Sequence, residues 1–311
     1  MTIHEMNIGD AVEGYYLLQT AVAKETGAGK PYLLMTLADC TGVIDAQIWN
    51  YAGPVTPRDI GGAVYVKGGV SEYRGLPQVT VDALRLADEN DKFDPAALVP
   101  AAPIDPEKTW NEISALVDSI ADPDYAGVCR EMLRRYGDRF REIPAAKSVH
   151  HAFLNGLLMH TANMLRAADF MSGVYSEVID RSLLLTGTLL HDFAKAEEFV
   201  FSPLGVAVDY SVKGELLGHL VMGAQEVAGI AKEQNVPEEK SVLLQHLLLS
   251  HHGEPEYGAA VRPVCAESEL LSYLDMIDSR MEIYRETYQE VPAGQFSRRI
   301  FALDRRVYHH N

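Results

Sequence analysis

The spacing of the hydrophobic residues changes near residue 95, and this change constrains the fold more than any other feature of the chain. Before it, short runs with strand-like alternation are separated by turn residues. After it, hydrophobic residues recur every three or four positions, as in amphipathic helices. Residues 94–104 are rich in proline and alanine and have the composition of a linker. We therefore expect a multi-domain α+β protein, with a small β-barrel over residues 1–93 and an all-α helical bundle over residues 105–311.

Five strand-like runs fill the first domain, at residues 11–23, 32–39, 43–49, 63–73 and 78–86. Five short strands in so small a domain favour a Greek-key barrel of the oligonucleotide-binding (OB) type. Such barrels hold single strands by stacking bases on aromatic rings and by following the phosphates with basic residues. The residues that fit these roles are Lys30, Tyr32, Trp49, Tyr73 and Arg74. For Tyr32 and Trp49 the alternative is a place in the barrel core.

Five histidines and two aspartates stand out in the second domain, because each lies in or at the end of a predicted helix with a strong apolar face. They are His160, His191, Asp192, His219, His251, His252 and Asp275. An ionised aspartate on such a face is costly to bury unless it is paired or bound to a metal. A single buried histidine is usually an ordinary core residue, but the whole set favours a metal site. Imidazole and carboxylate ligands suit Mn, Fe, Zn, Co or Ni, and two ions roughly 3.5–4 Å apart are the usual arrangement for hydrolysing phosphoesters.

The charge and the cysteine content indicate which classes of function and which cellular compartment fit this chain. A net charge of −17 repels phosphate at long range, which counts against a general nucleic-acid coat protein. It does not count against an enzyme whose bound cations supply local positive charge. The three cysteines are widely spaced and odd in number, which is typical of reduced thiols in the cytoplasm. No apolar run approaches the roughly 18 residues of a membrane span, and no signal peptide is visible, so we expect a cytoplasmic location and no membrane partner.

The order His, then His-Asp, then Asp along predicted helices resembles the HD-domain phosphohydrolase superfamily. In that resemblance His191 and Asp192 form the name-giving pair, His160 is the first histidine and Asp275 is the last aspartate. A more specific resemblance lies in residues 150–157, 160–161, 191–195, 214–219, 250–253 and 255–258, which are similar to the YhaM-type 3′→5′ exoribonucleases. These enzymes join an N-terminal OB domain to an HD domain, so the resemblance covers nearly the whole chain.

The resemblance implies a manganese-dependent exonuclease that hydrolyses single-stranded RNA, and also DNA, from the 3′ end. Iron, cobalt, zinc, nickel and magnesium are the alternatives to manganese. The residues that would hold one metal are His160, His191, Asp192 and Asp275. Asp192 would bridge to a second metal held by His219 and His251, with His252 as a further candidate. A homo-oligomer would be compatible with this function, although nothing in the residues points to one.

Lys195 is the second catalytic candidate beside Asp192. It follows His191 by four residues and so would share its helical face. It would bind the scissile phosphate or orient the attacking water, and the alternative is a solvated lysine paired with Glu198. We expect His150 and His151 either to support the site or to cap a helix, and residues 308–311 to form a surface tail.

Two departures from the resemblance concern substrate contacts more than metal binding. Met159 stands where a glutamate is expected, and Phe193 and Ala194 stand where isoleucine and glycine are usual. Two other functions stay open beside the exoribonuclease. One is a nucleotide or cyclic-dinucleotide phosphohydrolase that uses the same HD site, and the other is a non-catalytic OB-fold protein that binds nucleic acid.

Overall fold

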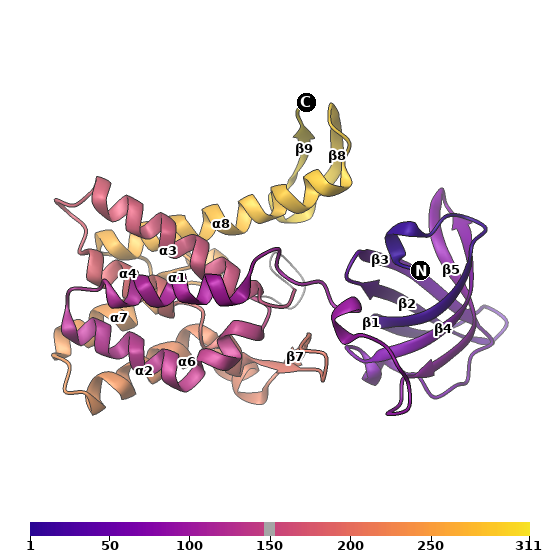
Figure 1. Ribbon diagram of the computed structural model, residues 1–311, viewed down its shortest axis with the longest axis horizontal. Helices are drawn as coiled ribbons and strands as arrows, with labels where there is room; N and C mark the ends of the chain where they lie inside the picture. Colours follow the sequence, from indigo (N-terminus) through magenta and orange to yellow (C-terminus); the bar gives the residue numbers. More distant parts are fainter. Residues whose placement is uncertain (146–152) are drawn as a thin grey trace. The chain divides into compact units, whose positions relative to one another are not determined.

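A computed structural model describes residues 1–145 and 153–311, which divide into two compact units (Figure 1). The first unit contains Met1–Ala102 together with Val200–Asp209, and the second contains Pro103–Phe199 together with Tyr210–Asn311. A short segment of the predicted helical domain is thus grouped with the barrel. Within the described residues, no helix combines the length and the hydrophobicity needed to cross a membrane.

The first unit is a closed barrel of five strands. The strands are β1 (Ala11–Glu25), β2 (Pro31–Asp39), β3 (Gly42–Trp49), β4 (Ala63–Tyr73) and β5 (Leu76–Leu86). Strand β1 pairs antiparallel with β2 and β4, β2 with β3, and β4 with β5, while β3 and β5 are parallel. The resulting order, β1-β2-β3-β5-β4 and back to β1, is that of the OB fold. The predicted barrel is confirmed.

Alternate residues of the strands fill the interior of the barrel. On β2, the side chains of Leu33, Met35 and Leu37 are buried, as the period of two requires. Gly68 lies at a bulge of β4, where a Cβ atom would be only 2.2 Å from the carbonyl oxygen of Thr80 on β5. The missing side chain therefore lets the two strands approach closely where the ladder is irregular.

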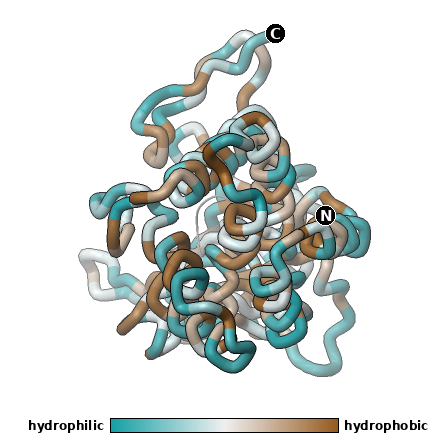
Figure 2. The backbone as a smooth tube through the Cα atoms, turned by 90° about the vertical axis from the view of Figure 1, so that its left-hand side faces the viewer, coloured by the Kyte–Doolittle hydropathy of each residue, from teal (hydrophilic) through white to brown (hydrophobic). Residues whose placement is uncertain are grey.

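The second unit is a bundle of helices, as predicted. Its helices are α1 (Pro106–Asp118), α2 (Pro123–Glu142), α3 (Gly156–Val174), α4 (Arg181–Leu190), α5 (Lys195–Glu198), α6 (Val212–Glu233), α7 (Glu238–Ser250) and α8 (Ala266–Glu290). The carboxylates of Asp105, Asp122 and Asp180 accept backbone N–H groups at the starts of α1, α2 and α4. Every residue from Ser182 to Leu190 is buried, so α4 lies at the centre of the bundle. Figure 2 shows the apolar residues gathered toward this centre and polar residues on the outer turns.

Two short hairpins depart from the all-helical expectation. One pairs β6 (Phe199–Phe201) with β7 (Ala207–Tyr210), and the other pairs β8 (Gln295–Ile300) with β9 (Arg305–His309). The second hairpin projects from the end of α8 (Figure 1) and takes in part of the segment predicted as a tail. Strands this short contain too few alternations to be recognised by their period.

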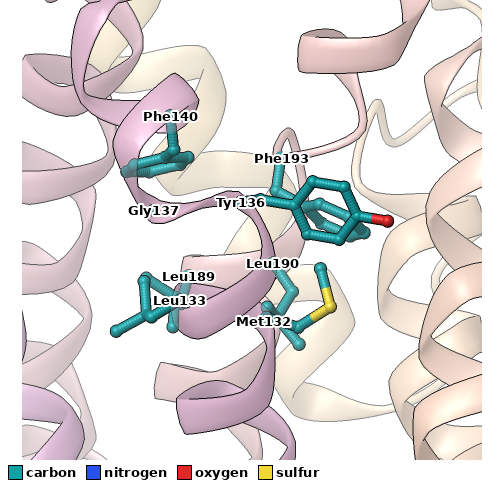
Figure 3. Close-up of a pocket in the computed structure, with 8 residues that line it drawn as sticks. All are labelled: Met132, Leu133, Tyr136, Gly137, Phe140, Leu189, Leu190 and Phe193. Carbon is teal, nitrogen blue, oxygen red and sulfur yellow. The ribbon is translucent and has the colours of Figure 1, made fainter.

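Phe193, which follows the His-Asp pair directly, belongs to the core between α2 and α4 (Figure 3). It is 5% exposed, and its ring centroid lies 5.5 Å from that of Tyr136. The small apolar pocket around them is completed by Met132, Leu133, Gly137, Phe140, Leu189 and Leu190. The departure at Phe193 therefore affects core packing rather than substrate contacts.

Candidate metal centre

Five helices bring the seven predicted metal ligands together. His160 lies in α3, His191 and Asp192 follow the last residue of α4, His219 lies in α6, His251 and His252 follow α7, and Asp275 lies in α8. Five of them are buried, while His252 and Asp275 are partly exposed. Residues separated by more than a hundred positions thus meet at one point, because each stands at a helix end or on an inward helix face.

The carboxylate of Asp192 lies between two groups of histidines. Its Oδ1 atom is 3.3 Å from His219 Nε2 and 3.6 Å from His251 Nε2. Its Oδ2 atom is 3.4 Å from His191 Nε2 and 3.8 Å from His160 Nε2. Each oxygen therefore faces its own pair of imidazoles, which is the arrangement that a carboxylate bridging two ions needs.

Further contacts complete each of the two groups. His160 Nε2 lies 3.2 Å from His191 Nε2 and 3.4 Å from Asp275 Oδ1. The ring centroids of His251 and His252 lie 4.3 Å apart. The ligand atoms of His160, His191 and Asp275 lie within 4.8 Å of one another, and so do those of His219, His251 and His252.

Unsatisfied polar atoms concentrate in this cluster. Seven buried side-chain nitrogen or oxygen atoms of the described residues have no hydrogen-bond partner. Four of the seven belong to predicted ligands: Asp192 Oδ1, His219 Nε2, His251 Nε2 and His252 Nδ1. Buried polar groups are almost always paired, and three of these unpaired atoms, Asp192 Oδ1, His219 Nε2 and His251 Nε2, lie close together, which indicates a cation. The donor set, which contains imidazole and carboxylate and no thiolate, fits a divalent metal ion.

The other ring nitrogens of the histidines explain why the Nε2 atoms are available. His191 Nδ1 donates to the carbonyl oxygen of Thr188 at 2.8 Å, and His251 Nδ1 donates to that of Leu248 at 2.8 Å. A carbonyl oxygen only accepts, so the proton must be on Nδ1 in both rings. In these tautomers Nε2 carries a lone pair directed at the cluster, as a metal ligand requires.

Two carboxylates that sequence reasoning missed orient His160 and His219. Asp278 Oδ2 lies 2.7 Å from His160 Nδ1, and Glu198 contacts His219 Nδ1 with both oxygens at 3.0 and 3.1 Å. Asp278 follows Asp275 by three positions on α8, so helical spacing was a signal for it. Glu198 had no such signal, because its contact depends on a local break in α6.

This break occurs at Gly218, whose φ of 69° lies in the left-handed region. The carboxylate of Glu198 accepts the backbone N–H of His219 at 2.9 Å and so caps the helical segment that starts there. The same carboxylate holds the imidazole of His219, so one side chain fixes both the backbone and the ring.

Lys195 is largely buried and contacts Asp192. Its Nζ donates to Asp192 Oδ2 at 2.6 Å, and its side chain is only 16% exposed. We expected Lys195 and His191 to share one helical face. This prediction is wrong, because α4 ends at Leu190 and α5 begins at Lys195. The turn between the helices brings the ammonium back toward the carboxylate.

The charges of the site shift the pKa values of its members. Burial opposes ionisation of Asp192, but the Lys195 ammonium and the neighbouring histidines hold the pKa of its carboxyl well below the usual range. Burial on its own would lower the pKa of His160. The carboxylates of Asp275 and Asp278 outweigh burial and raise this pKa to about 10. The acids therefore favour a positive charge at this point of the site.

His251 and His252 show the opposite behaviour. Burial lowers the pKa of His251, and burial together with the neighbouring imidazoles lowers the pKa of His252 to about 3. Both rings are therefore neutral at physiological pH, which is the form that binds a metal.

The cluster opens into a cleft of about 490 Å³, a size typical of sites for small molecules. Its walls include His160, Asp192, His251, His252 and Asp275. They also include Lys195, Tyr257, Tyr273 and Arg280. Of these four, only Lys195 was predicted as a site residue. A phosphorylated group that entered the cleft would meet the cluster and two cationic side chains.

The predicted nucleic-acid contacts belong to the barrel unit. Trp49 is 48% exposed, so the alternative that it fills the barrel core is wrong. The ring centroids of Trp49 and Tyr32 lie 4.8 Å apart, and Lys30 is exposed in the adjacent β1–β2 loop. Tyr73 and Arg74 form the β4–β5 turn, with the guanidinium 5.2 Å from the tyrosine ring centroid. His150 and His151 lie outside the described residues.

Comparison with known proteins agrees with this fold and site. Residues 157–280 match the family described as HD domain. An OB-type barrel joined to an HD domain defines the class of protein. The relative named "3'-5' exoribonuclease YhaM" from Shouchella clausii is 34% identical over 314 residues, which cover 99% of this chain and 95% of the relative. The proteins of the same name from Bacillus licheniformis and Halalkalibacterium halodurans are both 32% identical, and the alignments cover 96% and 93% of their lengths. This chain belongs to the YhaM family of 3′-5′ exoribonucleases.

Two solved structures resemble only the barrel. A crystallised domain of replication protein A from Methanococcus maripaludis is 24% identical, with a TM-score of 0.25, over 28% of this chain and 92% of that chain. The second OB-fold domain of replication protein A from the same organism, solved by NMR, is 19% identical, with a TM-score of 0.22, over 30% of this chain and 98% of that chain.

Proposed function

We propose that this protein is a metal-dependent exoribonuclease that removes nucleotides one at a time from the 3′ end of single-stranded RNA, with single-stranded DNA as a further substrate. The observation that carries the proposal is the carboxylate of Asp192, whose two oxygens face two separate pairs of imidazoles beside a cleft. Membership of the YhaM family supports the choice of phosphodiester hydrolysis.

The metal ligands follow from the two groups of the cluster. One ion would be held by His160, His191, Asp192 and Asp275, and a second by Asp192, His219, His251 and His252. When bound, such ions lower the pKa of a coordinated water toward 7 and neutralise the oxygens of the phosphate. We propose manganese, with iron, cobalt, zinc, nickel and magnesium as alternatives, because the donors are imidazoles and carboxylates.

The chain's own residues bind the substrate and orient the site. Lys195 holds Asp192 at 2.6 Å and lines the cleft, where its ammonium would contact a non-bridging oxygen of the scissile phosphate. Arg280, on the cleft wall, would contact the next phosphate. Attack of a water oxygen on phosphorus breaks the bond to the 3′ oxygen of the preceding nucleotide, and the product is a 5′-mononucleotide.

The barrel would hold the strand outside the cleft. In OB folds the face formed by strands 2 and 3 and the β1–β2 and β4–β5 loops bind single strands. Lys30, Tyr32 and Trp49 lie on that face or beside it, and Tyr73 and Arg74 lie in the second loop. The rings of Tyr32 and Trp49 are in contact and partly exposed, so they are available to stack with a base.

A single-stranded RNA labelled at its 5′ end tests the proposal. With manganese, we expect a ladder of products that shortens from the 3′ end, and EDTA should abolish it. An RNA hairpin with a blunt end is the control and should be shortened far more slowly. Internal cuts, or no cuts while small nucleotides are hydrolysed, would contradict the proposal and favour an endonuclease or a nucleotide phosphohydrolase.

A further inference from the structure

The C-terminal hairpin of β8 and β9 is attached to α8 by a small core of its own. Ile283 of α8 packs with the buried Leu303 and Val307, and Ile300 covers this cluster. The strands pair with Phe296 opposite Tyr308 and with a bulge before Arg299. One face of the hairpin is thus fixed to the helix, and the opposite face is turned to the solvent.

Three aromatic residues lie on the solvent side of the hairpin. Phe296 is 56% exposed and Tyr308 is 44% exposed, and their ring centroids lie 4.9 Å apart. Phe301, in the three-residue helical turn Phe301–Leu303 that joins the strands, is 98% exposed. So complete an exposure of phenylalanine is unusual, because contact with water is unfavourable for an aromatic ring.

The same hairpin carries four exposed arginines. They are Arg298, Arg299, Arg305 and Arg306, and Asp304 is the single acidic residue among residues 291–311. The segment carries a charge of +3 in a chain whose net charge is −17, so it is a local reversal of sign. The guanidinium of Arg306 lies 4.9 Å from the ring centroid of Phe296. Arginines interleaved with exposed aromatic rings are the composition of surfaces that bind single-stranded nucleic acid.

The turn of the hairpin adjoins the cleft of the metal centre. Ala302, the residue after Phe301, lines that cleft together with Ile283 and Arg280. Arg280 and Asp275 both lie on α8, five positions apart. A strand leaving the metal centre would therefore pass Arg280 and reach Phe301 before it reached the rest of the hairpin.

We propose that the solvent face of this hairpin is a second binding site for single-stranded RNA. It would hold the nucleotides on the 5′ side of the one being removed, with Phe301 stacking on a base at the rim of the cleft and the arginines contacting phosphates. This inference rests on the proposed function, since it takes the cleft as the site of the 3′ end. The hairpin would make the enzyme favour longer strands over very short ones.

The test compares Phe301→Ala with Phe170→Ala, a matched control at another phenylalanine, which is 71% exposed on α3. Binding of a 15-nucleotide RNA is measured by fluorescence anisotropy in EDTA, so that no cleavage occurs. We expect Phe301→Ala to weaken binding about tenfold, Phe301→Trp to restore it and Phe170→Ala to leave it unchanged. Arg298→Ala combined with Arg299→Ala should make the negative slope of log affinity against log salt shallower by about 1.4. Arg130→Ala should leave this slope unchanged.

Cleavage separates this site from the metal centre. Phe301→Ala should lower kcat/KM about tenfold for the 15-nucleotide RNA, mainly through KM, and leave kcat/KM for a dinucleotide unchanged. Equal losses on both substrates, or no loss of binding, would overturn the proposal. A change in molar mass by light scattering in the Phe301→Ala variant would also overturn it, because the face would then be a contact between copies of the chain. Wild-type protein that cuts neither substrate would refute the proposed function, and the anisotropy result would still decide on the hairpin.

Discussion

Replacing Asp192 by asparagine perturbs the metal centre at its most connected residue. The change keeps the shape of the side chain and removes its negative charge. Oδ1 and Oδ2 face different imidazole pairs at 3.3 to 3.8 Å, so one substitution weakens both proposed metal sites. Loss of one electrostatic contact in an active site costs about 10²–10³ in rate. With both sites affected, we expect kcat/KM on RNA to fall by at least about 10³-fold, which corresponds to roughly 4 kcal/mol.

The fold should survive this substitution. The amide oxygen of asparagine still accepts a hydrogen bond from Lys195, so we expect a loss of stability of only about 1–3 kcal/mol. Asp124→Asn is the matched control, because Asp124 also accepts a lysine ammonium at 2.6 Å, from Lys240, but lies far from the ligands in sequence and outside the cleft lining. Cleavage of 5′-labelled RNA and thermal unfolding by circular dichroism measure the two effects. A folded Asp192→Asn protein within tenfold of wild-type activity at saturating manganese would refute the bridging role.

Three further outcomes follow from single side chains. Glu198→Gln should weaken the hold on His219 and raise the manganese concentration needed for half-maximal activity about 10- to 100-fold, with recovery at excess manganese. Trp49→Ala should weaken the binding of single-stranded RNA to the protein about 5- to 100-fold in an anisotropy titration and leave dinucleotide hydrolysis unchanged. Arg85 holds the pKa of the Asp91 carboxyl well below its ordinary value, so this pair stabilises the barrel at neutral pH and loses its effect as the pH falls below about 4. The difference in Tm between wild type and Asp91→Asn should therefore shrink as the pH is lowered from 7 to 3, and a constant difference would contradict the assignment.

The barrel and the helical bundle could be predicted because their signals are local. Alternation along the strands and apolar spacing along the helices placed the five strands within a few residues of their observed ends. The same local signals could not decide the role of Trp49, since it ends strand β3, where the inward and outward faces are no longer distinguished. The short strands of the two hairpins were missed for a related reason, because so few residues do not establish a period.

The sequence was enough to single out the seven residues that form the cluster, but not the side chains that orient them. A single histidine on an apolar helix is usually a core residue, and it was the whole set of five histidines and two aspartates that indicated a metal site. Asp278 could have been found by its spacing from Asp275, but Glu198 reaches His219 only because α6 breaks at Gly218. A break of this kind is set by tertiary contacts and not by the local pattern.

In our proposal the histidine–aspartate cluster binds two metal ions, and both ions are needed to cut RNA from the 3′ end. The most direct measurement titrates manganese into metal-free protein and follows bound metal and 3′-end cleavage in the same sample. We predict two ions per chain in the wild type, with cleavage rising as the second ion binds, and at most weak binding and no cleavage in Asp192→Asn. Cleavage by fully metal-free protein, or equal metal binding in the two proteins, would contradict the account.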